Sequence, residues 1–398
     1  MPDNSRLVRE KLDQAAAILD ELGIDAWLTF VRETALSPDP SLDLILGLDM
    51  VWQSAFIVTR DNQRIAIVGK HDMENVEAVG GYTTIIPYVE GIRESLLSVL
   101  LQIDPQTLAL NYSESDVAAD GLAHGLMLLL QRYLIDTDLA ERFVSAEPVI
   151  AALRGRKSHL EVERIQAAIE TTLAIFYQVG EFARPGMSEV EVASFVHDLC
   201  QEQRLDTAWE ADYCPTVSAG PSSPIGHAGP MVQYVIKPGA LVHMDFGVRQ
   251  DDYCADLQRV WYVRRDEDDA PPHAVRQGFE VVRGALQAGL EALVPGAQGW
   301  QVDAAARTAI VEAGYPEYQH AFGHHVGRAA HDGSTVLGPR WERYGDTPMG
   351  VIEAGNVFAI ELGVEVEGYG YVGQEENVLV TPEGGRWLSD PQTEVWVI

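Results

Sequence analysis

Two aspartates, Asp245 and Asp256, occupy interior positions of apolar, strand-like runs within HMDFGVRQDDYCADLQRVWYV, residues 243–263. The segment has the pattern of two strands around a turn. If the turn is centred between Gln250 and Asp251, the two aspartates lie directly opposite each other on one face of a sheet. Like charges in that position destabilise a hairpin, and buried charges need a partner or a metal ion. The pattern therefore predicts a positive charge between them.

A second acid pair follows the same pattern. In residues 356–380, Glu361 and Glu375 are equidistant from Gly368, and a glycine-containing turn there predicts that these two carboxylates also lie opposite each other. Two hairpins that each carry a self-repelling pair are hard to attribute to chance. Four other acids of this region are interpreted as solvated charges: Glu353, Glu365, Glu367 and Glu376.

Histidines lie between the two segments, in HAFGHHVGRAAHDG, which contains His320, His324, His325 and His331. Four acids and one histidine could hold two divalent ions, with carboxylates bridging them. Hard oxygen ligands with one imidazole favour manganese, cobalt or zinc over a thiolate-type site. We therefore favour a metal site, rather than separate surface or core roles, for the combination of Asp245, Asp256, His324, Glu361 and Glu375.

The elements around these segments form a weak internal repeat. Residues 182–200 and 293–311 each join a helix to Pro-Gly and then to a second helix, and in the first copy Ser188 and Glu191 have capping-box spacing. Each copy is followed by one of the carboxylate-bearing hairpins. The duplication strengthens the interpretation of the two acid pairs as one site.

The first third of the chain alternates between helical and strand patterns. A helix over residues 6–22 should end at Gly23, and strands are predicted at 24–31, 52–59 and 64–69. Helices near 92–103 and 121–134 and a strand at 107–113 complete a small α/β unit without a catalytic motif. The basic, polar stretch RGRKSHLEVER marks the boundary, which gives domains at 1–154 and 155–398.

Composition places the chain among ordinary soluble proteins. Its 398 residues are 46% hydrophobic and 22% charged, and no apolar stretch is long enough to span a bilayer. The formal charge of −32 argues against a nucleic-acid partner. No targeting signal is visible at the start of the chain. Cys200, Cys214 and Cys254 have no paired spacing, so we expect buried free thiols and a reducing compartment, the cytoplasm.

With these motifs the chain resembles the pita-bread metallopeptidases, in particular the Xaa-Pro dipeptidase (prolidase) and aminopeptidase P branch. The resemblance rests on LRGRKSHLEVERIQAA, on the ten residues between the two aspartates, and on GHHVGRAAH, EAGNVFAIE and EENVLVT. It implies a creatinase/prolidase-type α/β N-terminal domain followed by an α+β pita-bread catalytic domain with a pseudo-twofold repeat. The Gly-His-x-x-Gly pattern selects His324, not His325, as the ligand beside Asp245, Asp256, Glu361 and Glu375.

The N-terminal unit and the five metal ligands favour the prolidase and aminopeptidase P branch over other members of the family. Methionine aminopeptidases usually lack the N-terminal unit, and creatinase has lost the metal ligands, whereas all five are found here. Three positions depart from the family pattern: Gly373 replaces a frequent Arg, Ser222 an Asn and Leu362 a Pro. These departures concern substrate handling and metal tuning more than metal binding.

The resemblance also implies roles for individual residues. Two divalent ions, manganese or else cobalt or zinc, would activate a bridging water, with Glu361 as general base. His331 would stabilise the oxyanion, His227 would contact the substrate carbonyl or leaving proline, and His320 would shape the proline pocket. Arg340 and Arg343, in GPRWERYGD, could hold a free proline carboxylate.

The expected substrate is a small peptide with proline in second position. Together with the compact N-terminal unit, the two arginines favour Xaa-Pro dipeptides. An aminopeptidase P acting on longer peptides and a non-catalytic binding protein on the same fold remain alternatives. The resemblance further implies a homodimer.

Overall fold

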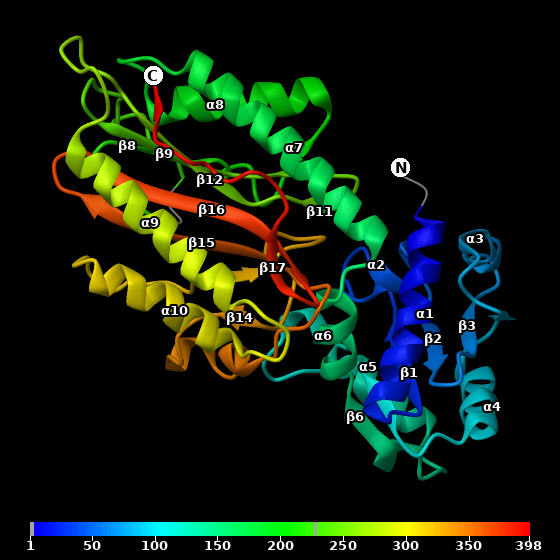
Figure 1. Cartoon of the computed structure of the whole chain (residues 1–398). Helices are drawn as coiled ribbons and strands as arrows, with labels where there is room; N and C mark the ends of the chain where they lie inside the picture. The colour runs from blue at the N-terminus through cyan, green and yellow to red at the C-terminus, as the bar shows by residue number, and fades with distance from the viewer. Residues whose placement is uncertain (1–3, 227–228) are drawn as a thin grey trace. The chain divides into compact units, whose positions relative to one another are not determined.

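The structure, a computed structural model, describes residues 4–226 and 229–398 (Figure 1). The chain divides into two compact units, Met1–Arg154 and Gly155–Ile398. Within the described residues, none of the helices combines the length and hydropathy needed to cross a bilayer.

The N-terminal unit is a six-stranded mixed sheet in the order β4-β3-β2-β1-β5-β6. Its strands are β1 (Ala26–Val31), β2 (Ser54–Thr59), β3 (Arg64–Gly69), β4 (Thr84–Tyr88), β5 (Leu108–Leu110) and β6 (Phe143–Ser145). Its helices are α1 (Ser5–Leu22), α2 (Leu42–Ile45), α3 (Met73–Val79), α4 (Arg93–Ile103), α5 (His124–Tyr133) and α6 (Glu147–Gly155), with short 3-10 turns at Val117–Ala119 and Leu139–Arg142.

The predicted elements of this unit are confirmed. Helix α1 ends at Gly23, whose φ of 67° provides the left-handed cap that glycine favours. Strands β1 to β3 are buried along their length because side chains of both faces enter a core. One core contains Leu12 of α1 and Trp27, and the other contains Leu28 and Leu130 of α5. The unit is therefore an α/β layer structure with helices on both faces of its sheet.

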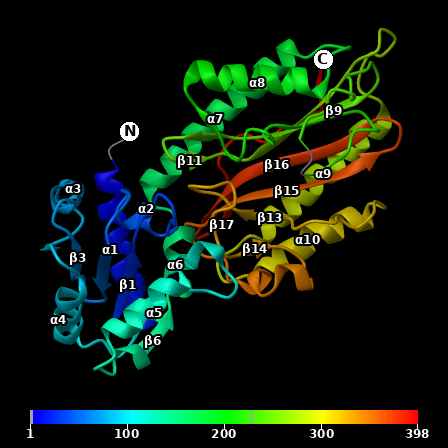
Figure 2. The same ribbon diagram turned by 180° about the vertical axis from the view of Figure 1, so that it is seen from behind.

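The C-terminal unit is built on a nine-stranded sheet, whose central path runs β14-β13-β15-β16-β12-β9-β8 (Figures 1 and 2). These strands are β8 (Thr216–Ala219), β9 (Leu241–Phe246), β12 (Leu257–Tyr262), β13 (Gly323–His325), β14 (Val336–Leu337), β15 (Val357–Val366) and β16 (Gly370–Thr381), extended by β17 (Gly384–Trp387) and β18 (Trp396–Val397). A small second sheet contains β7 (Asp206–Thr207), β10 (Val248–Gln250) and β11 (Tyr253–Cys254).

Two helix pairs cover this unit, as the internal repeat predicts. They are α7 (His159–Phe182) with α8 (Glu189–Gln203), and α9 (His273–Ala292) with α10 (Gly299–Glu312); 3-10 turns lie at Glu342–Tyr344 and Thr347–Met349. The capping box of Ser188 and Glu191 at the start of α8 is confirmed. Helix α7 packs Phe176 against Phe246 and Trp261, while α9 and α10 share a core with β15 and β16.

The turn of the first hairpin differs from the prediction. Asp251 and Asp252 form it, both with positive φ (49° and 68°), and Gln250 pairs with Tyr253. Two-residue turns of this kind match the twist of the flanking strands, and aspartate tolerates the left-handed conformation better than most residues. The turn is thus centred one residue later than predicted.

This shift changes the partner of Asp245. Asp245 pairs with Gln258 on β12, so the prediction that it lies directly opposite Asp256 is wrong. Asp256 precedes Gln258 by two residues and therefore remains on the same side of the hairpin. The two carboxyl groups still interact, as neighbours on a diagonal.

The second hairpin confirms its prediction. Glu361 on β15 pairs with Glu375 on β16, and the turn contains Gly368 with a φ of 79°. The expectation for the cysteines is also confirmed, since Cys200, Cys214 and Cys254 are free and buried.

Candidate metal centre

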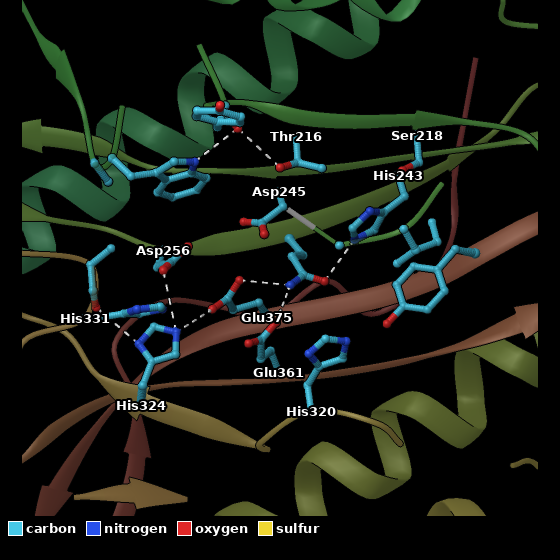
Figure 3. Close-up of a pocket in the computed structure, with 18 of the residues that line it drawn as sticks. Thr216, Ser218, His243, Asp245, Asp256, His320, His324, His331, Glu361 and Glu375 are labelled. Atoms are coloured by element: carbon cyan, nitrogen blue, oxygen red, sulfur yellow. Dashed lines mark hydrogen bonds and ion pairs between the residues drawn. The ribbon is translucent and has the colours of Figure 1, made fainter. Parts of the chain in front are cut away.

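The acids are aligned by the register of the large sheet. Five residues pair in succession across β8, β9, β12, β16 and β15, namely Thr216, Asp245, Gln258, Glu375 and Glu361. Paired residues of a sheet share a face, so these side chains form one row, and Figure 3 shows the acids of the row beside the histidines. Acidic side chains are rarely buried without a partner, so the row points to a site rather than to core packing.

Asp256 joins the row from the segment that leads into β12. Its backbone N–H donates to Asn377 Oδ1 (3.2 Å), and its carbonyl oxygen accepts from Asn377 Nδ2 (2.9 Å). Asn377 lies two residues beyond Glu375 on β16, so this double hydrogen bond fixes Asp256 beside Glu375. Sequence reasoning gave Asn377 no role, although it belongs to the EENVLVT motif.

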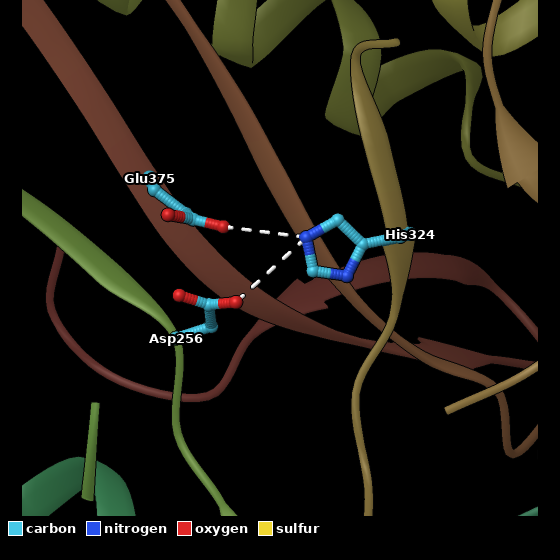
Figure 4. A group of neighbouring side chains, drawn as sticks. All are labelled: Asp256, His324 and Glu375. Atoms are coloured by element: carbon cyan, nitrogen blue, oxygen red, sulfur yellow. Dashed lines mark ion pairs between the residues drawn. The ribbon is translucent and has the colours of Figure 1, made fainter. Parts of the chain in front are cut away.

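His324 approaches from β13. Its Nδ1 lies 3.1 Å from the carbonyl oxygen of Ala330, which requires a proton on Nδ1 and leaves a lone pair on Nε2. Nε2 lies 3.8 Å from Asp256 Oδ2 and 3.7 Å from Glu375 Oε1 (Figure 4). Burial lowers the pKa of His324 to about 3, so the ring is neutral and its lone pair faces two acceptor oxygens. A cation between the three groups would satisfy all of them.

The electrostatics of the acids favour the same conclusion. Burial, and then repulsion between neighbouring carboxylates, raises the pKa of Asp245, Asp256 and Glu375 well above the usual range. Burial raises the pKa of Glu361 to about 7. Asp245 Oδ1 has no hydrogen-bond partner among the described atoms. The cluster therefore needs either protons or metal ions to offset its charge.

The residues present fit a divalent ion. Ligand atoms of Asp256, His324 and Glu375 all lie within 4.8 Å of one another (Figure 4). Carboxylate oxygens with one imidazole nitrogen suit manganese, cobalt or zinc. Asp245 and Glu361 stand in the same row beside this triad, and their carboxylates add further oxygen donors of the same kind.

Gln258 lies at the centre of the row, and sequence reasoning missed it. Its Nε2 donates to Glu361 Oε2 (2.7 Å) and Glu375 Oε2 (3.1 Å), and its Oε1 lies 2.9 Å from His243 Nε2. A lone glutamine in a strand carries no chemical signal. With the correct turn, however, the sequence would have placed Gln258 opposite Asp245.

A cavity of about 660 Å³ opens over this row. His320 and His331 line it, and the ring centroid of His331 lies 4.2 Å from that of His324. None of the described lining residues is Lys or Arg. Other lining residues include Trp209, Glu210, Tyr213, Thr216, Ser218, Ile225, Tyr318 and Tyr371. His227, the remaining predicted site histidine, lies outside the described residues.

The structure does not bring Arg340 and Arg343 into the described lining of this cavity. The guanidinium carbon of Arg340 lies 4.4 Å from the ring centroid of Trp300. Arg343 donates to the carbonyl oxygen of Gln319 and lies over the ring of Trp341. Both arginines therefore have partners of their own outside the cavity.

Two neighbours of ligand candidates face away from the site. His325 is buried with its ring 4.1 Å from that of Phe358, because successive strand residues point to opposite faces. Glu376 is buried too, and its Oε1 lies 2.9 Å from Arg259 Nη1. The interpretation of Glu376 as a solvated charge is wrong, because both faces of this sheet are covered.

Known proteins resemble this chain along most of its length. The model of metallopeptidase family M24 matches residues 163–382. An uncharacterized peptidase of Bacillus subtilis, YqhT, is 27% identical over 250 residues, which are 63% of this chain and 66% of that protein.

Solved structures show the same fold. An Xaa-Pro dipeptidase from Bacillus anthracis matches with a TM-score of 0.74 at 23% identity, over 98% of this chain and 100% of that chain. An X-Pro aminopeptidase from Thermotoga maritima matches with a TM-score of 0.71 at 22% identity, over 97% and 99%. The fold is therefore a prolidase-type N-terminal domain followed by a pita-bread domain.

Proposed function

The chain belongs to metallopeptidase family M24, and on that premise we propose that it hydrolyses the peptide bond between an amino-terminal residue and a following proline. The observation that carries the proposal is the convergence of Asp256, His324 and Glu375 on a cavity, with Asp245 and Glu361 in the same row. Solved structures with this fold include an Xaa-Pro dipeptidase and an X-Pro aminopeptidase.

We assign the five ligand candidates to two divalent ions, manganese first, with cobalt or zinc as alternatives. Ions held there would supply Lewis-acid activation of the scissile carbonyl and would acidify water. This activation suits an Xaa-Pro bond, because its proline nitrogen carries no hydrogen and cannot donate a hydrogen bond to a protease. The residues of the chain then orient the substrate and move its protons.

Three residues that line the cavity receive roles. Glu361 is assigned as the general base, because it ends the carboxylate row at the cavity. His331, whose ring lies 4.2 Å from that of His324, is assigned to stabilising the oxyanion of the tetrahedral intermediate. His320, whose ring lies 5.6 Å from that of Tyr318, is assigned to the proline pocket. The role of His227 toward the substrate carbonyl or the leaving proline stays a prediction from the resemblance.

Substrate length has two candidates. Xaa-Pro dipeptides are expected if Arg340 or Arg343 holds the proline carboxylate. Longer peptides are the second candidate, and the cavity lining favours them. The lining contains several acidic side chains, and no Lys or Arg stands among the described lining residues to pair with the free carboxylate of a dipeptide.

The test is hydrolysis of Xaa-Pro, Xaa-Pro-Xaa and Xaa-Ala peptides by the purified chain with added manganese. Cleavage of proline peptides without cleavage of Xaa-Ala supports the proposal, and comparable cleavage of Xaa-Ala overturns the proline assignment. A chain that binds ions and peptides but turns none over would be the non-catalytic alternative. Metal content of the purified chain measures ion binding independently of turnover.

We also propose a homodimer. Leu36, Val51 and Trp52 are 85%, 53% and 60% exposed, and their segments are joined by a hydrogen bond from Glu33 N to Val51 O. Clustered exposed apolar side chains mark interaction surfaces. Light scattering of the wild-type chain and of Trp52→Ser tests this surface, and a monomeric wild type would contradict it.

A cytoplasmic location completes the proposal. Cys200, Cys214 and Cys254 are free thiols in the structure. Free cysteines are typical of proteins in reducing compartments.

A further inference from the structure

Gln258 occupies the position in the carboxylate row where its amide reaches both glutamates. Its Nε2 lies 2.7 Å from Glu361 Oε2 and 3.1 Å from Glu375 Oε2. Carboxylates that hold a metal ion are ionised and only accept hydrogen bonds, so in the metal-loaded site the NH2 group of the amide must face them. The amide oxygen then faces His243.

His243 fixes that orientation. Its Nε2 lies 2.9 Å from Gln258 Oε1, so Nε2 must carry the proton and donate it. Buried His243 packs its ring edge-on against Tyr371, with 5.1 Å between ring centroids. An amide that rotated to present its oxygen to the glutamates would lose this donor and repel both carboxylates. The hydrogen bond from His243 therefore favours the orientation in which the NH2 group of Gln258 faces the two glutamates.

Gly373 provides the space for this pair. A Cβ at position 373 would lie 2.6 Å from His243 Nε2 and 2.7 Å from Gln258 Oε1. Both distances are shorter than real Cβ contacts, so a larger residue at this position would displace the amide or the imidazole. The glycine at position 373, where the family pattern often has Arg, therefore leaves the space that the hydrogen bond between Gln258 and His243 occupies.

We propose that Gln258, oriented by His243 in the space left by Gly373, is a positioning residue that holds Glu361 and Glu375 in the geometry for the second metal ion. The inference rests on the proposed two-ion centre. Gln258 donates a hydrogen bond to Oε2 of Glu375. Oε1, the oxygen nearer His324, is left for the first ion. The hydrogen bond from Gln258 to Glu361 is the shorter of the two, 2.7 Å against 3.1 Å to Glu375.

A neutral donor suits this task. Lysine or arginine in the row would also hold the glutamates, but its charge would compete with the metal ions for them. The amide stabilises both carboxylates through charge-assisted hydrogen bonds and adds no positive charge. The compensating charge is then left to the ions.

The experiment measures binding of Mn²⁺ and Co²⁺ to the full chain by calorimetry, with the visible spectrum of bound Co²⁺ as a second readout. Gln258→Met keeps the length of the side chain and removes both donors. We expect one ion to bind as in wild type and the affinity for the second to fall by about 10- to 100-fold, the usual cost of losing a ligand's hydrogen-bond partner. The Co²⁺ spectrum should change in proportion to the missing ion.

Two further variants act on Gln258 from outside the carboxylate row. His243→Leu and Gly373→Ala should both reduce second-ion affinity, although neither residue is a ligand candidate. Gly385→Ala is the matched control, because its Cβ would meet Leu290 Cδ1 at 2.8 Å, away from the cavity lining. If Gln258→Met does not fold, these variants decide the question, and thermal unfolding identifies which chains are folded.

The outcomes separate the inference from the proposed function. If wild type binds two ions and the folded Gln258, His243 and Gly373 variants bind both with unchanged affinity, the inference is overturned and the metal centre stands. A wild type that binds no second ion overturns the inference and the two-ion centre together. Selective loss of the second ion in these variants, with Gly385→Ala unchanged, supports the inference.

Discussion

Glu361 and Glu375 lie directly opposite each other on β15 and β16, and both accept a hydrogen bond from Gln258. Carboxylates in this position repel each other, and one neutral amide cannot cancel two charges. Burial raises the pKa of both groups, so the ion-free chain retains protons here at a pH where ordinary glutamates have lost them. Metal binding must therefore displace protons.

Asp256→Asn should lower the metal stoichiometry and abolish hydrolysis. Asp256 Oδ2 belongs to the triad assigned to the first ion, and an amide in its place supplies a weaker, neutral donor. Metal analysis of the dialysed protein and a peptide assay measure the two effects. Full metal content together with full turnover would refute the ligand assignment.

Glu361 should make the ion-free chain less stable as the pH rises from about 4.5 to about 7. The pKa of Glu361 is about 7 in the folded chain against an ordinary 4.5, so over this range the folded state binds more protons at this group than the unfolded chain does, and the contribution of Glu361 to stability falls with rising pH. Burial lowers the pKa of His243, His324 and His325, which acts in the opposite direction, so thermal unfolding of wild type and Glu361→Gln after EDTA treatment, at several pH values within this window, isolates the contribution of Glu361.

Added Mn²⁺ should remove that loss, because ions take the place of the protons. At a concentration of 100 Kd, one bound ion adds about 2.7 kcal/mol to the free energy of unfolding. A difference in melting temperature between ion-free wild type and Glu361→Gln that does not change with pH would contradict this prediction, as would a wild-type chain whose melting temperature does not respond to Mn²⁺.

His331→Ala should retain its ions and lose most of kcat. Removal of one oxyanion donor typically costs about 10²- to 10³-fold, and His331 lines the cavity beside His324. Metal content and steady-state kinetics distinguish loss of catalysis from loss of ions. A variant with depleted metal would instead make His331 a ligand.

His325→Ala is the matched comparison on the opposite face of β13. Its ring packs on Phe358 in the core, so the variant should keep metal and turnover per folded molecule. Its free energy of unfolding should fall by about 2–5 kcal/mol, as for other large-to-small core changes. Denaturant unfolding measures this loss. Catalytic failure in folded His325→Ala with an active His331→Ala would show that the motif was aligned in the wrong register.

Symmetry about a turn was enough to predict one hairpin and insufficient for the other. Gly368 has positive φ and marks the centre between Glu361 and Glu375. The first hairpin has no glycine at its turn, and aspartates at 251 and 252 adopt that conformation. The sequence holds adjacent polar residues there, so its centre could be misplaced by one residue.

Side-chain environments were predicted less well than strands. Gln258 acquires its role from its neighbours in the sheet, which a linear pattern does not reveal. Glu376 resembled a solvated charge because its partner Arg259 lies on another strand. The positions of Arg340 and Arg343 depend on loop packing against Trp300 and Trp341, for which sequence spacing provides no rule.

Substrate length is the last prediction. We expect Xaa-Pro-Xaa tripeptides to be cleaved at least as fast as Xaa-Pro dipeptides, and Arg340→Ala and Arg343→Ala to leave the KM for dipeptides unchanged. Neither arginine belongs to the described lining of the cavity, which includes no Lys or Arg. In a tripeptide the group after proline is a neutral amide, so no free carboxylate needs a cation at that position.

If one of the two arginines does hold the proline carboxylate, the expected rise in KM can be stated. A charge-assisted hydrogen bond to a carboxylate contributes about 1.5–3 kcal/mol, so loss of an arginine that holds the proline carboxylate should raise KM for dipeptides by about one to two powers of ten. Arg340→Lys and Arg343→Lys provide the control, since lysine keeps the charge and should recover part of such a loss. A rise in KM of that size in either alanine variant, with tripeptides left uncut, would identify a dipeptidase and show that the loop of the two arginines reaches the substrate. The metal centre would stand in either case, because its five ligand candidates act on the bond before proline, whereas the arginines would act on the carboxylate after it.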